Sequence, residues 1–419
     1  MRLALGVPLS VSLAWSPSTR LPVARLAMAD GLAQLEWSRE VISTGLPVAA
    51  LDTYPPTPGL HAARTRAFDG LHGFLADSLP DGWGQLLMRR RLARAEVDIT
   101  TLTPLDRLAL VGDQGRGALV FRPATTPQDP VETLDLDDLA AATMTVLEGE
   151  APALADTLTR LGGGSGGARP KVHIGFDAAG EVAIGDGEAP AGFEPWIVKF
   201  RAPDDPDDIG PIEAAYADMA AAAGIVMSPH RLIPARKGHP YFATRRFDRP
   251  SGGGRLHMVS LAGAVEAPWD RPSASYDTYL RATRAITRQA GDVDQAFRRM
   301  LFNVLACNRD DHTRQHAYLM DAAGDWTLAP AYDLTHSTGP GGEHYLDIEG
   351  EGRRPGRGHV LALGARHGIG AKSVHAMIDD VSAAVSDWTV FAVASGVTTA
   401  SQARIAKAMA RVRADFEGR

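Results

Sequence analysis

The residues best suited to chemistry lie in NRDDHTRQH, which begins at Asn308 and holds two aspartates and two histidines. A further acid, Asp333, follows in the motif PAYDL. Transfer of a γ-phosphoryl group needs one carboxylate that accepts the proton of the attacking hydroxyl, and other oxygen ligands that hold Mg²⁺ across the phosphates. The pattern predicts the base within the cluster Asp310, Asp311 and His312, and a metal-binding carboxylate at Asp333. Acids also cap turns and helices, so a purely structural interpretation competes with this one.

A glycine-rich run precedes this cluster and surrounds one serine, Ser165, with Gly162, Gly163, Gly164, Gly166 and Gly167. Glycine permits positive φ and a close approach of the backbone to a ligand, and exposed amides in such a loop can bind phosphate oxygens. The run matches neither the Walker pattern nor the dinucleotide fingerprint, and taken alone it is equally typical of a flexible linker.

A lysine interrupts an otherwise apolar strand-like segment, PWIVKF, in which Lys199 is the only charged residue. Burying an ammonium is costly without an anionic partner, and the following helix supplies Glu213. In phosphoryl transfer such a lysine binds nucleotide phosphates while the acid orients it. The alternative is a lysine that extends to solvent at a strand end, and a glutamate that favours the helix dipole.

The elements that position these residues follow from apolar periodicity. The segment PWIVKF alternates as a strand, and KVHIGF and EVAIGD flank a turn at Gly180, which predicts a β-hairpin. Apolar residues at helical spacing predict a helix over residues 212–224 and another from about residue 290 to Asn308. The acidic cluster is therefore expected on a loop that leaves a buried helix.

The N-terminal third mixes strand-like runs with turns, and its first segment, MRLALGVPLSVSLAW, is predicted to be a core strand. The proline-rich stretch PATTPQDPVET, from Pro123, is predicted to be a linker. Residues 137–161 are predicted to form one helix, and the C-terminal residues 399–416 another.

Composition limits the class of protein. A chain of 419 residues is expected to fold into two or three packed units, and 45% apolar with 22% charged residues is the balance of a globular protein. The net charge of −7 gives no overall attraction to nucleic acid. A single cysteine, Cys307, excludes an internal disulfide and a cysteine-ligated zinc site. With no apolar run long enough to span a bilayer, a cytoplasmic location is expected.

The order of these motifs resembles the HipA family, the serine/threonine kinase toxins of bacterial type II toxin–antitoxin modules. The resemblance covers GGARPK, WIVKF, ATRRFDR, NRDDHTRQHAYL and LAPAYDL, together with FADSLPDGWG and LDRLALVGDQGRGAL nearer the N-terminus. It implies an α+β fold, two-lobed and protein-kinase-like, with a small β-rich lobe and a larger helical lobe preceded by an N-terminal α/β subdomain. The expected boundaries are 1–124, 125–248 and 249–419.

The resemblance also implies a role for individual residues. Asp310 matches the family's catalytic base, His312 the histidine of the catalytic loop, and Asp333 the magnesium ligand. Lys199 matches the lysine that contacts phosphate, and residues 243–247 match the segment that lines the adenine pocket. The expected ATP-binding residues are Gly164, Ser165, Gly166, Gly167, Lys171, Lys199, Glu213, Arg246 and Phe247.

Two positions depart from the family's pattern. Gln315 occupies the place of an asparagine that is the second metal ligand, and its carbonyl lies one methylene farther from the backbone. Since Mg²⁺ demands near-ideal octahedral geometry, this site could be altered. The family's autophosphorylated serine lies slightly earlier, where this chain has Gly163 and Gly164. Ser165 is therefore the candidate for autophosphorylation.

The resemblance implies an ATP- and Mg²⁺-dependent serine/threonine protein kinase that acts as a toxin. Its expected partners are a HipB-like DNA-binding antitoxin and a bacterial protein substrate, for which an aminoacyl-tRNA synthetase is one candidate. Contact with nucleic acid is expected only through the antitoxin, and none with a membrane. Two alternatives remain open: a degenerate kinase that binds nucleotide as a regulatory partner, and a metal-dependent phosphohydrolase or nuclease, which would leave Lys199 and the glycine-rich run unexplained.

Overall fold

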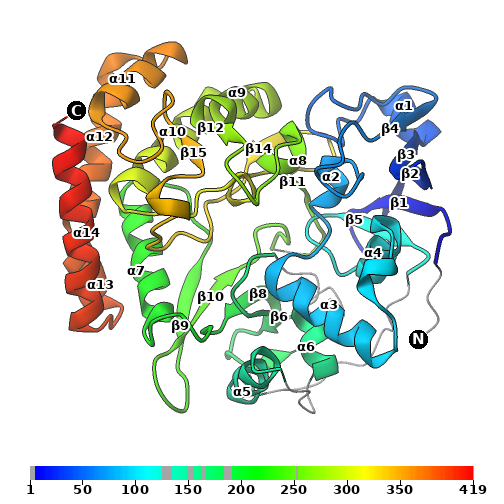
Figure 1. Cartoon of the computed structure of the whole chain (residues 1–419), viewed down its shortest axis with the longest axis horizontal. Coiled ribbons are helices and arrows are strands. Elements are labelled where there is room, and N and C mark those ends of the chain that lie inside the picture. The colour runs from blue at the N-terminus through cyan, green and yellow to red at the C-terminus, as the bar shows by residue number, and fades with distance from the viewer. Residues whose placement is uncertain are drawn as a thin grey trace.

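Figure 1 shows a computed structural model of the chain, which describes residues 5–124, 135–149, 155–162, 166–183, 191–251 and 253–418. Strands and helices are mixed in the N-terminal part and helices predominate towards the C-terminus, in keeping with the expected α+β class. The linker predicted from Pro123 lies almost entirely outside the described residues, and so do Gly163, Gly164 and Ser165.

The N-terminal unit is built on a five-stranded antiparallel sheet in the order β4-β3-β2-β1-β5. Alternate residues of β1, among them Leu9, Val11 and Leu13, are buried, which confirms the predicted core strand over residues 9–14 only. The strands are β1 (Leu9–Ala14), β2 (Arg20–Ala29), β3 (Leu32–Trp37), β4 (Leu60–Ala62) and β5 (Leu119–Arg122). The helices are α1 (Arg39–Thr44), α2 (Gly73–Ala76), α3 (Gly82–Arg94), the 3-10 turn η1 (Ile99–Thr101) and α4 (Pro104–Val111).

A second five-stranded sheet, in the order β7-β6-β8-β10-β9, carries the predicted lysine. Its strands are β6 (Lys171–Phe176), β7 (Val182–Ala183), β8 (Glu194–Lys199), β9 (His230–Ile233) and β10 (Tyr241–Arg245). Strands β6 and β7 pair antiparallel across the turn at Gly180, so the predicted hairpin is confirmed over its described part. Helix α7 (Ile209–Ala222) packs through Ala214 and Ala217 on Phe242 of β10.

The other face of this sheet is covered by α3, α5 (Leu136–Leu147) and α6 (Ala155–Gly162), which pack on Val172, Val198 and their neighbours. The prediction of one helix over residues 137–161 was wrong. Helix α5 ends at Leu147, and Gly149 adopts a positive φ of 101° that a continuing helix does not allow. The spacing of apolar residues alone did not predict this break.

The C-terminal part is mainly helical and is drawn yellow-green to red in Figure 1. Its central helix, α10 (Ala290–Leu305), buries Val293, Phe297, Met300 and Val304, as predicted from their spacing. The other helices are α8 (Leu261–Val265), α9 (Tyr276–Thr287), α11 (Arg357–Arg366), α12 (Ala371–Ser386), α13 (Trp388–Ala394) and α14 (Thr399–Glu417), with 3-10 turns η2 (Thr313–Gln315) and η3 (Pro340–Gly342).

Short strands complete this part. A three-stranded sheet has the order β11-β13-β14, with β11 (His257–Ser260), β13 (Ala317–Met320) and β14 (Trp326–Leu328), and β12 (Ala274–Ser275) pairs with β15 (Leu346–Asp347). The loop between α10 and β13 carries the acidic cluster, and the loop after β14 carries Asp333. Because β13 and β14 pair antiparallel, the start of β13 lies beside the end of β14, and these two loops lie at the same end of the sheet.

Two buried histidines lead to a prediction about acid stability. Burial lowers the pKa of His72 and of His257 to about 4 in each case, well below the ordinary value. The unfolded chain therefore binds more protons than the folded chain below pH ~6.5, so stability is full above that pH and falls as the pH drops towards 4. We expect a loss of about 1.4 kcal/mol per histidine per pH unit. A melting temperature that stays constant between pH 7 and pH 5 would contradict this.

Candidate active site

Lys199 stands at the centre of the site, at the end of β8 beside the first turns of α7. Its Nζ lies 2.7 Å from Oε2 of Glu213 and also forms an ion pair with Oδ1 of Asp333. Burial alone would lower the pKa of Lys199, but the carboxylates of Asp333 and Glu213 outweigh it and raise the pKa. The predicted pairing of Lys199 with Glu213 is confirmed, and the lysine is a fixed cation.

Asp333 lies between two cations in a left-handed backbone conformation, with φ 58°. Burial opposes ionisation, but Lys199 and Lys171 outweigh it and hold the pKa of Asp333 far below its usual range. Its Oδ2 accepts a hydrogen bond of 3.3 Å from Nε2 of Gln315. The two residues predicted to bind the metal therefore lie side by side, with the carboxylate ionised.

These two residues suit Mg²⁺ in part. Among the described residues no group of three or more His, Cys, Asp or Glu side chains is arranged to hold a metal ion. Mg²⁺ commonly binds one or two carboxylates and completes its shell with water and substrate phosphates, so a sparse protein site is compatible with it. Gln315, however, presents its N–H to Asp333, and coordination through its Oε1 requires the amide to turn.

Asp310 follows α10 on the loop that the left-handed Cys307 turns away from the helix, with φ 57°. The side chain of Asp310 is 48% exposed, so a substrate can reach it. Partial burial raises its pKa, an effect that His312 opposes and that Asp333 and Asp311 reinforce. A carboxylate that is accessible and more basic than usual is suited to accept a proton.

His312 supports this loop. Its Nδ1 accepts the backbone N–H of Arg314 at 3.2 Å, and its Nε2 lies 3.9 Å from Oδ1 of Asp310. With Nδ1 accepting, a neutral ring carries its proton on Nε2 and directs it towards Asp310. The ring also packs against Trp269 and Tyr345. These contacts fit a role of His312 in positioning the loop better than a role in proton transfer.

Asp311 differs from its neighbour Asp310 in its surroundings. Its fully buried carboxylate accepts hydrogen bonds from the hydroxyl of Tyr276 at 2.6 Å, from Nδ1 of His344 at 2.8 Å and from the N–H of Tyr345 at 2.8 Å. Burial opposes ionisation, but His344 and these hydrogen bonds lower the pKa of Asp311. Asp311 anchors the loop and leaves Asp310 as the accessible acid of the cluster.

The described part of the glycine-rich loop approaches the same site. Nζ of Lys171 donates to the carbonyl oxygen of Gly166 at 2.5 Å, and burial lowers the pKa of Lys171. Gly167 has a φ of 88°, and a Cβ there would lie 2.6 Å from Nζ of Lys171. The positive φ favours glycine at this position, whereas the Lys171 ammonium could shift to admit a Cβ.

Arg169 belongs to this site, although no role was predicted for it from the sequence. Its Nη1 lies 2.7 Å from Oε1 of Glu213, and its Nε lies 3.0 Å from Oδ1 of Asp205. Glu213 thus holds Arg169 with one oxygen and Lys199 with the other. A cavity of ≈ 400 Å³ lies beside this group, between the first turn of α7 and the turn joining β9 to β10.

The residues predicted to line an adenine pocket occupy two different environments. The guanidinium of Arg246 is buried and bound to Asp248, with Nε 3.0 Å from Oδ1 and Nη2 2.8 Å from Oδ2. Any contact of Arg246 with a nucleotide would therefore have to come from its backbone. The ring of Phe247 packs on Tyr332, with 5.4 Å between ring centroids. Phe247 thus packs on the residue that directly precedes Asp333 in the chain.

Family models match most of the chain. The model of the HipA-like C-terminal domain matches residues 163–388, and the model of the HipA N-terminal domain matches residues 18–122. The chain belongs to the HipA family. Both HipA domains are thus present, in the order that the sequence motifs predicted.

The individual proteins that this chain resembles are distant in sequence. The solved HipA of Shewanella oneidensis MR-1, in a complex with HipB and operator DNA, matches 97% of this chain and 96% of its own with a TM-score of 0.70 at 16% identity, which confirms the fold. The curated Sinorhizobium fredii protein named "Putative kinase Y4mE" is 29% identical over 132 residues, 29% of this chain and 31% of that protein. Helicobacter pylori CtkA, described as a proinflammatory kinase, matches 52% of this chain and 92% of its own, with 11% identity and a TM-score of only 0.32.

Among the described residues, no helix has both the length and the apolar character needed to cross a membrane.

Proposed function

We propose that this chain is an ATP- and Mg²⁺-dependent serine/threonine protein kinase and the toxin of a bacterial toxin–antitoxin module. The observation that carries the proposal is the position of Lys199 between Glu213 and Asp333, with the accessible Asp310 on a neighbouring loop. A lysine held by an acid, a metal-binding carboxylate and a separate proton acceptor are the parts that phosphoryl transfer requires. Membership of the HipA family supports the same reading.

Each residue has a distinct task in this proposal. Lys199 and Lys171 bind the phosphates of ATP, and Glu213 keeps Lys199 in place. Asp310 accepts the proton of a serine or threonine hydroxyl as its oxygen attacks phosphorus, while the bond from the γ-phosphorus to the bridging oxygen breaks. Asp333 and Gln315 would hold Mg²⁺, which supplies positive charge to the phosphates. The nucleotide base would lie against residues 243–247.

Partners belong to the proposal as well. The Shewanella HipA is solved with HipB and its operator DNA. We propose a HipB-like antitoxin for this chain, contact with DNA only through that antitoxin, and a cytoplasmic location. The substrate would be a bacterial protein, with an aminoacyl-tRNA synthetase as one candidate. The proposal also includes a division of the chain into units 1–124, 125–248 and 249–419. It further includes autophosphorylation of Ser165.

Expression in bacteria tests this function. Cells producing the native chain should stop growing and should contain a host protein newly phosphorylated on serine or threonine, detected by quantitative mass spectrometry. Cells producing Asp310→Ala should show neither effect. Growth arrest that persists in Asp310→Ala at equal protein levels would contradict the kinase function and favour a nucleotide-binding regulatory partner.

The identity of residue 315 favours this second candidate, because Gln315 stands where the family's pattern has an asparagine ligand and its carbonyl lies one methylene farther from the backbone. If Gln315 is a strained metal ligand, Gln315→Asn should lower the Mg²⁺ concentration needed for half-maximal phosphoryl transfer by about tenfold. The measurement is a Mg²⁺ titration of transfer at fixed ATP. An unchanged Mg²⁺ requirement would remove residue 315 from the metal site.

A further inference from the structure

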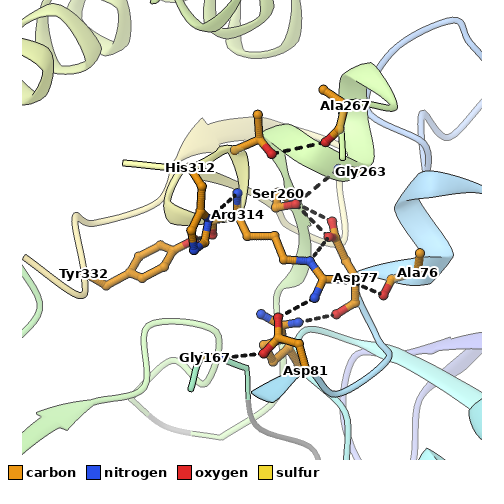
Figure 2. Close-up of polar contacts among 12 residues, drawn as sticks. Ala76, Asp77, Asp81, Gly167, Ser260, Gly263, Ala267, His312, Arg314 and Tyr332 are labelled. Carbon is orange, nitrogen blue, oxygen red and sulfur yellow. Dashed lines mark hydrogen bonds and ion pairs between the residues drawn. The ribbon is translucent and has the colours of Figure 1, made fainter. Parts of the chain in front are cut away.

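The segment between α2 and α3 of the N-terminal unit reaches the glycine-rich loop and the catalytic loop at once. This segment, residues 77–81, is called here the bridging segment, and Figure 2 shows its polar contacts. Asp81 lies at its end, nearly buried, with 9% of its side chain exposed. The sequence motif FADSLPDGWG pointed to the family but gave this acid no role.

The carboxylate of Asp81 joins the two loops directly. Its Oδ1 accepts the backbone N–H of Gly167, and its Oδ2 forms an ion pair with Nη1 of Arg314, as the dashed lines in Figure 2 show. Burial opposes ionisation, but Arg116 and Arg314 outweigh it and lower the pKa of Asp81. One ionised side chain therefore ties the glycine-rich loop to the loop that carries Asp310 and Gln315.

The start of α3 strengthens the hold on the glycine-rich loop. The N–H of Trp83 donates to the carbonyl oxygen of Gly167 at 3.1 Å, and its indole Nε1 donates to the carbonyl oxygen of Lys171 at 3.0 Å. Gly82 has a φ of 41°, and a Cβ there would lie 2.6 Å from the carbonyl oxygen of Gly167. The backbones thus meet at a distance that only glycine allows.

On the other side, Arg314 is fixed by several elements. Its Nη2 donates to the carbonyl oxygen of Ala76 at 3.1 Å, and its Nε lies 3.8 Å from Oδ1 of Asp77. Its carbonyl oxygen accepts the hydroxyl of Tyr332 at 2.6 Å, and its N–H binds His312. Arg314 therefore connects the bridging segment to His312, which lies beside Asp310, and to Tyr332, which precedes Asp333 in the chain.

The bridging segment is itself anchored to the helical part. The carboxylate of Asp77 accepts the hydroxyl and the N–H of Ser260, each at 2.6 Å, where Ser260 caps α8. At the same contact, a Cβ on Gly73 would lie 2.7 Å from the carbonyl oxygen of Gly263. Asp81 is thus presented to both loops from a fixed support.

We infer that Asp81 is a positioning residue: by holding Gly167 and Arg314 together, it sets the separation between the loop that binds the phosphates and the loop that carries the base. The inference rests on the proposed function for its effect on ATP, but not for its effect on the loops. A misplacement of about 1 Å in such a site is enough to cost about a hundredfold in rate.

Asp81→Asn is the first test, because it keeps the size of the side chain and removes its charge. Calorimetry with ATP and Mg²⁺ should show binding weakened by about tenfold relative to the native chain. Hydrogen exchange followed by mass spectrometry should show faster exchange in peptides covering residues 166–176 and 308–320. The matched control is Asp69→Asn, since Asp69 is an exposed acid of the same unit that pairs with Arg107. It should change neither measurement.

A second variant guards against a general loss of folding. Asp81→Glu keeps the charge but moves it by one methylene, so a positioning role predicts faster exchange in the same two peptides at a near-native melting temperature. Arg314→Gln combined with Asp81→Asn should give less than the sum of the two single effects, because the residues act as one unit.

The outcomes separate this inference from the proposed function. If the native chain binds no ATP, the proposed function fails, whereas the exchange measurement still decides whether Asp81 holds the loops. If Asp81→Asn and Asp81→Glu lower the melting temperature but leave exchange in both peptides and ATP affinity as in the native chain, Asp81 is only a structural contact and the inference is overturned.

Discussion

Asp310→Asn is expected to lower phosphoryl transfer by about a thousandfold while leaving the affinity for ATP within about twofold of the native value. The amide keeps the shape of the side chain but cannot accept the proton of the attacking hydroxyl. Asp310 is accessible and is not among the partners of Lys199, so the phosphate-binding part of the site should remain intact. Single-turnover transfer together with calorimetry measures both quantities.

The pH dependence of the native chain provides the companion measurement. Because partial burial raises the pKa of Asp310, the acid limb of the rate profile should lie above the ordinary aspartate value near ~4. The base is ionised and active above its pKa and is protonated below it.

The control for Asp310→Asn is Asp311→Asn, which should instead lower the melting temperature because Asp311 is a buried anchor. Equal rates for Asp310→Asn and the native chain would exclude Asp310 as the base.

Lys199→Met is expected to weaken ATP binding by about 10- to 100-fold, since a charge-assisted contact to phosphate contributes about 1.5–3 kcal/mol. Transfer should fall further, because Asp333 loses the cation that contributes most to holding its pKa low. Lys171 keeps a second ammonium beside Asp333, so the loss of ATP binding should be partial rather than complete. Calorimetric titration with ATP, with and without Mg²⁺, measures the effect.

Lys237→Met is the matched control for this variant. Lys237 is an exposed lysine on the turn between β9 and β10, and it borders the cavity beside Glu213 without pairing with that acid in the described contacts. Its replacement should leave ATP affinity close to native. If both lysine variants weaken ATP equally, the effect is one of general charge and Lys199 has no specific place in the site.

The parts of the fold that the sequence predicted are those governed by local patterns. Strand β8 was identified by alternation and α10 by its apolar stripe, because each buries one regular face. The pairing of Lys199 with Glu213 was predictable for a similar reason. A charged residue on an apolar strand requires a partner, and the next helix offered one.

The contacts that escaped prediction connect residues far apart in the sequence. Asp81 and Arg314 are separated by 233 positions, and nothing in the local pattern of either segment indicates the other. Asp311 was grouped with its neighbour as a possible reacting acid, and only its three buried hydrogen bonds distinguish the two. The break after α5 was missed because apolar residues continue on both sides of Gly149, and their spacing does not reveal its positive φ.

Transfer of labelled γ-phosphate from ATP by the purified chain, with Mg²⁺ and with a chelator, tests the central claim most directly. A working kinase should place label on itself or on an added bacterial lysate protein with Mg²⁺, and hydrolysis should recover phosphoserine or phosphothreonine. No label should appear with the chelator or with Asp310→Ala. Tight binding of ATP without any label, regained in Gln315→Asn, would contradict a working kinase and identify a protein that acts by binding nucleotide.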